Sequence, residues 1–228
     1  MEQQNIVWII IPAKDEERHI GKVIEETKRY SEYFNNILVV DDGSSDSTTE
    51  IAKQQSVQVI RHIINLGKGA ALKTGCDYAI KKGAEIIIAM DADLQHEPKE
   101  IPNFLKVLKE NNADIIFGYR KLTGEMPLIL KFGNFFINTM FSLLYNIQVR
   151  DSQSGYRCFT KQAYQKIRWQ SFDYSMESEM IARAGKNKLK YKEIPIQTIY
   201  HDKYKGTTVF DGIRIVVKMV WWKISRSV

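Results

Sequence analysis

Apolar and polar positions form alternating blocks along the first half of the chain. Short, continuous runs rich in β-branched residues are separated by longer segments with apolar residues at helical spacing. Such runs are typical of strands buried on both faces, so the pattern predicts an α/β fold with a mostly parallel central sheet flanked by helices. Strands are expected at 6–11, 37–40, 57–60, 85–90 and 114–118. Helices are expected at 15–30, 48–55, 67–82 and 97–110.

The second half of the chain is less regular. The pattern predicts an aromatic-rich helix, a polar loop, a second helix, an extended segment and a final amphipathic helix, at 128–145, 150–157, 172–186, 191–200 and 209–224. No internal repeat, low-complexity tract or linker interrupts the chain. We therefore expect a single domain over 1–228, with an active site assembled from both halves.

Composition narrows the class of protein. With 228 residues, 44% of them hydrophobic, the chain can bury a substantial core. The net charge of +6 suits an anionic partner such as phosphate, nucleic acid or a lipid headgroup, but it also suits ordinary solubility. Cys76 and Cys158 are too isolated for a disulfide framework or a zinc site, which favours a reduced cytoplasmic compartment.

Export signals and membrane spans have recognisable sequence patterns. The first five residues do not have the character of a signal peptide. The longest uncharged stretch, 132–149, is too polar and slightly too short for a bilayer span. We therefore expect neither a signal peptide nor a membrane-spanning helix.

Polar residues gather directly after the predicted strands. They form the segments 12–16, 41–44, 65–69 and 91–93. In an open parallel sheet, ligands bind outside the carboxyl ends of the strands. Carboxylates gathered at that edge repel one another unless a cation or hydrogen-bond donors relieve them. Taken singly, Asp15 and Asp46 also fit the role of a turn former or helix cap.

Asp91 and Asp93 are the strongest candidates for a metal site. In an extended strand their side chains point to the same side. Mg²⁺ and Mn²⁺ prefer oxygen ligands and are often held by one or two carboxylates together with substrate phosphates. Gln95 can add an amide contact, whereas His96 fits the start of the next helix better than metal coordination.

Other chemical motifs are weak or absent. The segment Gly67–Lys68–Gly69 lacks the P-loop pattern, although a helix that opens on it can present backbone N–H groups and an ammonium to a diphosphate. The chain contains no dinucleotide-binding glycine pattern, no GxSxG elbow and no Ser-His-Asp order.

Five ordered motifs resemble those of glycosyltransferase family 2. They are "VVDDGSSDST" (39–48), "NLGKGAALKTG" (65–75), "MDADLQHEP" (90–98), "DSQSGYRCF" (151–159) and "EIPIQT" (193–198). Within the family they are most similar to the dolichyl-phosphate-mannose and polyprenyl-phosphate-glucose synthases. The resemblance extends from residue 6 to about 215 and implies a GT-A fold, a nucleotide-sugar donor and a Mg²⁺ or Mn²⁺ ion that bridges the donor diphosphate.

The resemblance also implies roles for single residues. Contacts with the nucleotide-sugar are expected from Pro12, Ala13, Asp15, Glu16, Asp41, Asp42, Lys68, Asp91, Ala92, Asp93, Gln95 and Lys205. Asp91, Asp93 and Gln95 would form the metal site, and Asp41 or Asp42 would contact the base or ribose. Lys205 lies where relatives close a basic loop over the diphosphate. The nucleotide-sugar half is expected at about 1–120 and the acceptor half at about 121–208.

The acceptor side carries its own candidates. The resemblance implies an inverting transfer, and an ionised lipid phosphate would need no general base. The residues expected to hold that phosphate are Arg120, Lys131, Ser154 and Arg157, with surface charge as the alternative for the three cations. The catalytic candidates are Asp93, Arg120, Asp151 and Glu177. Asp151 and Glu177 can orient sugar hydroxyls or take a proton from a hydroxyl acceptor, and Glu177 equally fits a role at its helix start.

The final helix, with its amphipathic part at about 209–225, combines tryptophan with lysine and arginine. That combination favours the headgroup region of a membrane, and packing on the domain or in a dimer is the alternative. We therefore expect peripheral attachment to the cytoplasmic face of the cell membrane.

The leading hypothesis is a metal-dependent transfer of a hexose, mannose from GDP-mannose, onto a polyprenyl or dolichyl phosphate. The alternatives within the fold are UDP-glucose or UDP-N-acetylglucosamine as the donor, or a saccharide hydroxyl as the acceptor. A nucleotide-binding regulatory module is the alternative outside enzymology. Nucleic-acid binding is disfavoured because the basic residues are scattered and acidic residues line the expected cleft.

Overall fold

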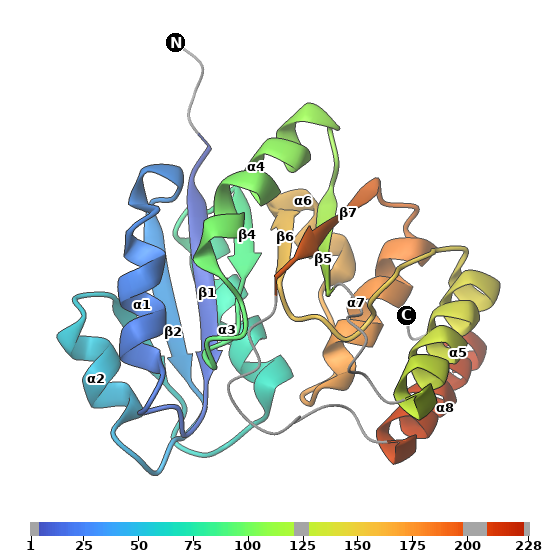
Figure 1. Ribbon diagram of the computed structural model, residues 1–228, viewed down its shortest axis with the longest axis horizontal. Coiled ribbons are helices and arrows are strands. Elements are labelled where there is room, and N and C mark those ends of the chain that lie inside the picture. Colours follow the sequence, from blue (N-terminus) through green and yellow to red (C-terminus); the bar gives the residue numbers. More distant parts are fainter. Residues whose placement is uncertain (1–4, 121–127, 198–208, 226–228) are drawn as a thin grey trace.

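A seven-stranded sheet organises the computed structural model, which describes residues 5–120, 128–197 and 209–225 (Figure 1). The side chains of 128–135 and 209–213 lie outside this description. The strands are β1 (Val7–Ala13), β2 (Asn36–Asp41), β3 (Gln58–Arg61), β4 (Ile86–Ala89), β5 (Ile115–Arg120), β6 (Arg157–Thr160) and β7 (Tyr191–Ile196). Their order is β3-β2-β1-β4-β6-β5-β7. Only β6 runs antiparallel to its neighbours.

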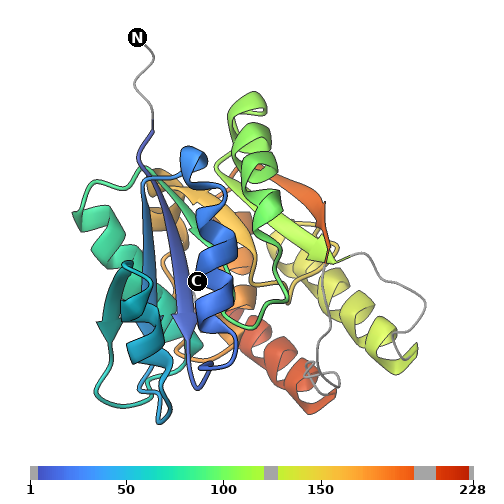
Figure 2. The ribbon, with the colours of Figure 1, turned by 60° about the vertical axis from the view of Figure 1, so that its left-hand side comes forward.

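Helices cover both faces of this sheet (Figure 2). They are α1 (Ile20–Lys28), α2 (Thr48–Gln54), α3 (Lys68–Lys81), α4 (Ile101–Glu110), α5 (Leu128–Tyr145), α6 (Lys161–Ile167), α7 (Ser175–Lys186) and α8 (Val209–Ser225), with short 3₁₀ turns at Ser31–Tyr33 and Pro98–Glu100. The α1, α2 and α4 helices pack on one face, while α3 and α5 to α8 pack on the other.

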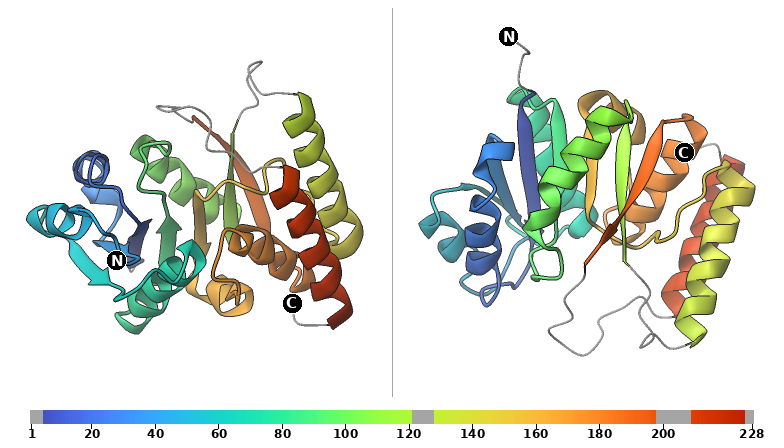
Figure 3. Two further views of the ribbon diagram at one scale, coloured as in Figure 1. Left: turned by 90° about the horizontal axis from the view of Figure 1, so that it is seen from below. Right: turned by 45° about the horizontal axis from the view of Figure 1, so that its top comes forward.

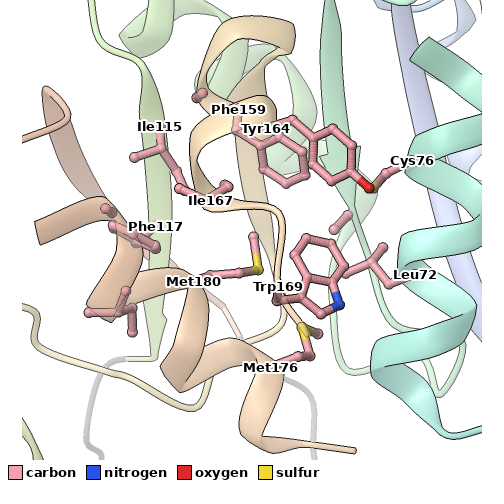
Figure 4. Packing of buried hydrophobic residues seen from close by; sticks show 14 of the residues in the cluster. Leu72, Cys76, Ile115, Phe117, Phe159, Tyr164, Ile167, Trp169, Met176 and Met180 are labelled. Carbon is pink, nitrogen blue, oxygen red and sulfur yellow. The ribbon is translucent and has the colours of Figure 1, made fainter. Parts of the chain in front are cut away.

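The two hydrophobic cores follow from the alternation of side chains along the strands. In β1, Trp8 and Ile10 belong to one core, and Ile9 and Ile11 belong to the other. Both sets are buried, which explains why the strand is a continuous apolar run. Figure 4 shows part of the larger core, where Trp169 packs among residues of α3 and α7.

The predicted α/β fold and its mostly parallel sheet are confirmed, and each of the five predicted strands is present within a few residues. Three helices begin later than expected, at Ile20, Ile101 and Ser175 instead of residues 15, 97 and 172. Asp15 adopts a left-handed backbone conformation, with φ of 54°, and therefore belongs to a turn. The extended segment expected at 191–200 contains β7, and its last three residues lie outside the described part of the chain.

The strand β6 and the helix α6 were not predicted. β6 has four residues and lies between β4 and β5, with Ala89 paired to Arg157 and Phe117 also paired to Arg157. Because β6 is antiparallel, its first residue lies at the carboxyl edge of β4 and β5. The polar loop before β6 is therefore held at the edge where ligands bind in α/β sheets.

We predict that Gly75→Ala destabilises the fold. A Cβ atom at Gly75 would lie 2.4 Å from Cγ2 of Ile10 and 3.0 Å from Cγ2 of Val40. Overpacking of this kind costs about 1–3 kcal/mol, which outweighs the gain of about 1 kcal/mol in helix propensity. Urea denaturation should show a lower free energy of unfolding for Gly75→Ala, and a change within about 0.5 kcal/mol for the exposed control Lys81→Ala. An unchanged or higher stability of Gly75→Ala would contradict this packing.

Candidate active site

The candidate site lies where the chain changes direction across the sheet. From β1 the chain proceeds outward through β2 and β3 and then returns to β4 on the other side of β1. Such a switch point leaves a crevice at the carboxyl ends of the strands. Figure 3, left, looks onto this edge of the molecule. Pro12 and Ala13 end β1 as buried residues, and Asp91 follows the end of β4 after one residue, Met90.

A lysine between two carboxylates forms the centre of the site. The Lys68 Nζ atom lies 2.8 Å from Oδ1 of Asp91 and 3.0 Å from Oε1 of Glu177. This contact joins the first residue of α3, the end of β4 and the first turn of α7. Burial lowers the pKa of Lys68, but the two carboxylates outweigh that effect and hold the pKa above its ordinary value. The lysine is therefore charged, and Glu177 contacts a cation instead of only capping its helix.

Asp93 carries negative charge that the protein relieves only in part. Its Oδ1 accepts a hydrogen bond from the backbone N–H of Gln95 at 3.0 Å. Burial, followed by the charge of Asp91, raises the pKa of Asp93. The Asp91 carboxyl shows the opposite result: burial would raise its pKa, but Lys68 and then His96 outweigh burial and lower it. A hard divalent cation would relieve the remaining repulsion, so Asp91 and Asp93 fit Mg²⁺ or Mn²⁺.

The protein alone does not complete a metal site. Within the described residues, no group of three or more His, Cys, Asp or Glu side chains is arranged around one point. Mg²⁺ is commonly held by only one or two carboxylates, with substrate phosphates and water as the other ligands. Asp91 and Asp93 therefore fit a cation that arrives with a phosphorylated substrate better than a permanently bound one.

His96 has a role that the sequence did not reveal. Its ring is buried and stacks on Tyr156 with ring centroids 4.8 Å apart. The backbone N–H of Asp91 donates a hydrogen bond to Nδ1 of His96 at 3.0 Å. Burial lowers the pKa of His96, which keeps the accepting nitrogen unprotonated. The imidazole therefore positions the backbone of Asp91.

Arg120 and Asp151 form a second ion pair. Nε and Nη2 of Arg120 donate to the two Asp151 oxygens at 2.6 Å and 3.0 Å, and the backbone N–H of Arg120 donates at 3.2 Å. Burial raises the pKa of Asp151, but Arg120 outweighs burial and lowers it. The charge of Arg120 also lowers the pKa of Asp91, which places this pair beside the central cluster.

The loop that precedes β6 closes one side of the site. A Cβ atom at Gly155 would lie 2.9 Å from both carboxylate oxygens of Asp91 and 3.0 Å from Nζ of Lys68. The β4–β6 register explains this contact, because Ala89 pairs with Arg157 and the same register continued by two residues brings Asp91 opposite Gly155. Only a residue without a side chain fits beside the ion pair.

Arg157 differs from the expectation that it holds an acceptor phosphate. The side chain is 1% exposed, and it donates to the backbone oxygens of Ser154, Glu177 and Ser152 at 2.8–3.1 Å. Burial lowers its pKa to about 10, so the guanidinium remains charged at neutral pH. The structure therefore assigns Arg157 to joining the loop before β6 to the start of α7.

Asp41 and Asp42 also differ from expectation, because the protein itself occupies their carboxylates. Asp41 accepts hydrogen bonds from the backbone and side chain of Ser44 and from Thr49. Asp42 accepts from His62 at 2.8 Å and from the backbone N–H groups of Leu66 and Gly67 at 2.9 Å and 2.7 Å. Both aspartates are buried and fix the loops after β2 and β3, so their expected contact with a base or ribose has no support here.

Asp15 and Glu16 join the loop after β1 to the loop after β2 through hydrogen bonds. The Asp15 N–H donates to Oγ of Ser44 at 2.9 Å, while Ser45 N–H donates to Oδ1 of Asp15 at 2.8 Å. The Glu16 N–H donates to Thr48 at 2.8 Å. A hydrogen bond from Lys14 is the main cause that lowers the pKa of the exposed Asp15 carboxyl to about 2.

The glycines beside Lys68 allow a close approach of backbones. A Cβ atom at Gly67 or Gly69 would lie 2.3 Å from O of Phe172 or 2.4 Å from O of Ser171. The Gly67 N–H donates to Asp42, and the Gly69 N–H donates to O of Phe172 at 2.7 Å. These two amides therefore donate inside the protein, so the possibility that they face a diphosphate gains no support. The ammonium of Lys68 remains at the site.

Two candidates cannot be placed. The side chain of Lys131 and the whole of Lys205 lie outside the described residues.

Ser154 and Ala92 are buried candidates. Ser154 lies in the loop before β6 and is 3% exposed, and Ala92 lies between the two aspartates in the sequence. The structure thus brings Lys68, Asp91, Glu177, Gly155 and Arg120 to one edge of the sheet.

Comparison with known proteins decides the family. A sequence model described as Glycosyl transferase family 2 matches residues 8–175. The chain belongs to this family. Its membership supports a glycosyltransferase and confirms the family predicted from the five motifs.

Relatives of this glycosyltransferase align over nearly its whole length. The uncharacterized protein MJ1222 of Methanocaldococcus jannaschii is 41% identical, over 96% of this chain and 92% of that protein. The UDP-N-acetylglucosamine–dolichyl-phosphate N-acetylglucosaminyltransferase of Methanococcus voltae is 33% identical, over 97% of both chains. The polyprenol monophosphomannose synthase of Mycolicibacterium smegmatis is 26% identical, over 95% of this chain and 86% of that protein.

A solved structure confirms the fold. Glucosyl-3-phosphoglycerate synthase from Mycobacterium tuberculosis, crystallised with Mn²⁺, UDP and glucosyl-3-phosphoglycerate, superposes with a TM-score of 0.74 at 16% identity. The match covers 94% of this chain and 80% of that chain. The GT-A glycosyltransferase fold implied by the motifs is therefore present.

We predict that Asp151→Asn lowers stability in a pH-dependent way. The folded state holds the pKa of Asp151 below its ordinary value, so the ionised carboxylate stabilises the fold above about pH 4 and loses this effect as the pH falls through the folded pKa. Because Arg120 is partly exposed, the variant should lose on the order of 2 kcal/mol at pH 7.

Urea denaturation at pH 7 and pH 3 tests this dependence. The difference between wild type and Asp151→Asn should shrink at pH 3. The control Glu25→Gln breaks an exposed ion pair with Arg29 and should change stability by less than about 0.5 kcal/mol at either pH. An equal loss for Asp151→Asn at both pH values would mean that the ion pair is not its cause.

Proposed function

We propose that this glycosyltransferase moves a sugar from a nucleoside diphosphate to a polyprenyl phosphate. The observation that carries the proposal is the Lys68–Asp91–Glu177 cluster at the switch point, with the Arg120–Asp151 pair beside it. Cations and carboxylates at this edge suit a substrate with both phosphates and hydroxyls. Two relatives that align over most of the chain are named for dolichyl-phosphate or polyprenol substrates.

The chemistry needs positioning more than proton transfer. An oxygen of the lipid phosphate attacks the anomeric carbon, a new carbon–oxygen bond forms, and the bond to the nucleoside diphosphate breaks on the opposite side. The attacking phosphate is already ionised, so no base has to remove a proton. Arg120, held by Asp151, would orient that phosphate, while Lys68 would place positive charge near the departing diphosphate.

Asp91 and Asp93 would hold a divalent metal ion. A bound Mg²⁺ or Mn²⁺ would neutralise charge on the diphosphate as it leaves. The support from the chain itself is the raised pKa of Asp93 and the oxygen character of the two ligands. The structural neighbour with Mn²⁺ and UDP is consistent with this role.

The names of the relatives bear on which sugar nucleotide is the donor. GDP-mannose was the leading hypothesis from the sequence, and one relative at 26% identity is named a polyprenol monophosphomannose synthase. The relative at 33% identity is instead named for UDP-N-acetylglucosamine. We therefore place UDP-N-acetylglucosamine first and GDP-mannose second.

A donor panel tests the proposal. The full chain is incubated with a short polyprenyl phosphate, Mn²⁺ or Mg²⁺, and one of UDP-N-acetylglucosamine, UDP-glucose or GDP-mannose, while nucleotide release and glycolipid are followed. We expect glycolipid with one donor. Transfer only to a saccharide hydroxyl would replace the proposed acceptor, and tight nucleotide binding without any product would favour a regulatory module.

We predict that Asp93→Ala abolishes metal-dependent turnover without unfolding the protein. Loss of one of two metal ligands should lower product formation by about 100-fold or more. Asp93 is only half-buried and follows the end of β4, so the melting temperature should change by a few degrees at most. The control Glu110→Ala, on the exposed end of α4, should keep full activity. Normal turnover of Asp93→Ala would remove the metal assignment.

We also propose that α8 docks on a membrane surface. Val217, Trp221 and Ile224 recur every three or four residues and are 62%, 65% and 72% exposed, while Arg214 on the same helix is exposed as well. α5, which lies beside α8, exposes Phe136 and Leu143 (Figure 3). No helix in the described part of the chain combines the length and apolar character needed to cross a bilayer.

Vesicle binding tests the docking surface. The wild type should sediment with vesicles that contain phosphatidylglycerol, and less so at high salt, because exposed apolar and basic groups act together. Trp221→Glu should reduce the bound fraction about fivefold or more. The control Gln54→Glu adds the same charge at an exposed position on α2 and should bind like wild type. Equal binding of wild type and Trp221→Glu would exclude α8 as the docking element.

A further inference from the structure

We propose that Glu177 and Ser154 form a recognition pair for a hydroxyl group of the donor sugar. The proposal rests on the proposed function and makes it more specific. Oε2 of Glu177 and Oγ of Ser154 are buried side-chain atoms that have no hydrogen-bond partner among the described residues. The two residues are 2% and 3% exposed.

Both residues are held against the central cluster by the same side chain. Arg157 Nε donates to the backbone oxygen of Ser154 at 3.0 Å, while its Nη1 donates to that of Glu177 at 2.8 Å. The other carboxylate oxygen of Glu177 binds Lys68 at 3.0 Å, and Gly155, next to Ser154, lies against Lys68 and Asp91. The two unpaired atoms therefore belong to the walls around one ion pair.

Unpaired buried polar atoms are expensive, and a carboxylate oxygen is more expensive than a hydroxyl. Native proteins leave few of them, so two at one site call for hydrogen-bonding partners that the chain itself does not supply. A sugar hydroxyl supplies what both atoms lack: it donates to the carboxylate oxygen and accepts from the serine hydroxyl. A neutral hydroxyl group, of the kind a donor sugar carries, therefore matches both atoms.

Two other ligand classes fit less well. A phosphate group is largely ionised at neutral pH and would be repelled by the charge of Glu177. A metal ion at Oε2 would lie close to the ammonium of Lys68, which is 3.0 Å from the other oxygen of the same carboxylate. A hydroxyl suffers neither repulsion, and a site built to bond one rejects analogues that lack it.

Calorimetric titration separates sugar contacts from nucleotide contacts. Wild type and Glu177→Gln are titrated, with Mn²⁺, against UDP and GDP and against UDP-N-acetylglucosamine, UDP-glucose and GDP-mannose. Loss of a charge-assisted hydrogen bond should weaken binding of the preferred sugar nucleotide by about 10–100-fold in Glu177→Gln. Binding of the matching nucleoside diphosphate should stay within about threefold, because Gln keeps an oxygen that can accept from Lys68.

A second variant tests the pair in case Glu177→Gln does not fold. Ser154→Ala should show a sugar-specific loss of about 3–10-fold, with a melting temperature close to that of the wild type. The control Ser178→Ala removes a buried hydroxyl that already has a partner, Gln153, and should show no loss specific to the sugar nucleotide.

Deoxy analogues of the preferred donor complete the test. Wild type should discriminate against one particular deoxy position, and Glu177→Gln should lose most of that discrimination. Equal weakening for nucleotide and sugar nucleotide, or discrimination unchanged in both variants, would overturn the pair while leaving turnover by the wild type intact. A wild type that binds no sugar nucleotide would overturn the pair and the proposed function together.

Discussion

The site depends on one interaction, the placement of the Lys68 ammonium between the carboxylates of Asp91 and Glu177. Buried charges are tolerated only when they are paired, so each carboxylate depends on the lysine that lies between them. The lysine begins α3, the aspartate follows β4 and the glutamate lies in the first turn of α7. Three distant parts of the sequence are thus tied together at the point where a substrate would bind.

The acidic residues at the carboxyl edge form two groups, which differ in how many hydrogen-bond donors surround them. Asp15, Asp41 and Asp42 accept hydrogen bonds from neighbouring loops and so build the walls of the crevice. Asp91 and Asp93 interact with each other and with Lys68, and keep charge that a cation can use. The same residue type at the same edge therefore serves either the scaffold or the chemistry, depending on how many donors surround it.

Sequence patterns were sufficient to predict the parallel strands and to predict which edge of the sheet carries the site. Continuous apolar runs report burial on both faces, and polar residues directly after them report the edge. The patterns failed for β6, because a four-residue strand that pairs with two distant strands has no local signature. They also failed for Arg157, Asp41 and His96, because sequence does not show which polar groups the folded chain already satisfies.

The reversed strand β6 has a consequence for how such enzymes can diversify. Because β5 ends and β6 begins at the same edge, the connecting chain both departs from and returns to the crevice without passing through the sheet. The last part of this segment, however, lies against the donor side, because Gly155 fits beside Asp91 and Lys68 only without a side chain. An exchange of this segment therefore alters the donor side as well, unless the residues that meet the Lys68–Asp91 pair are retained.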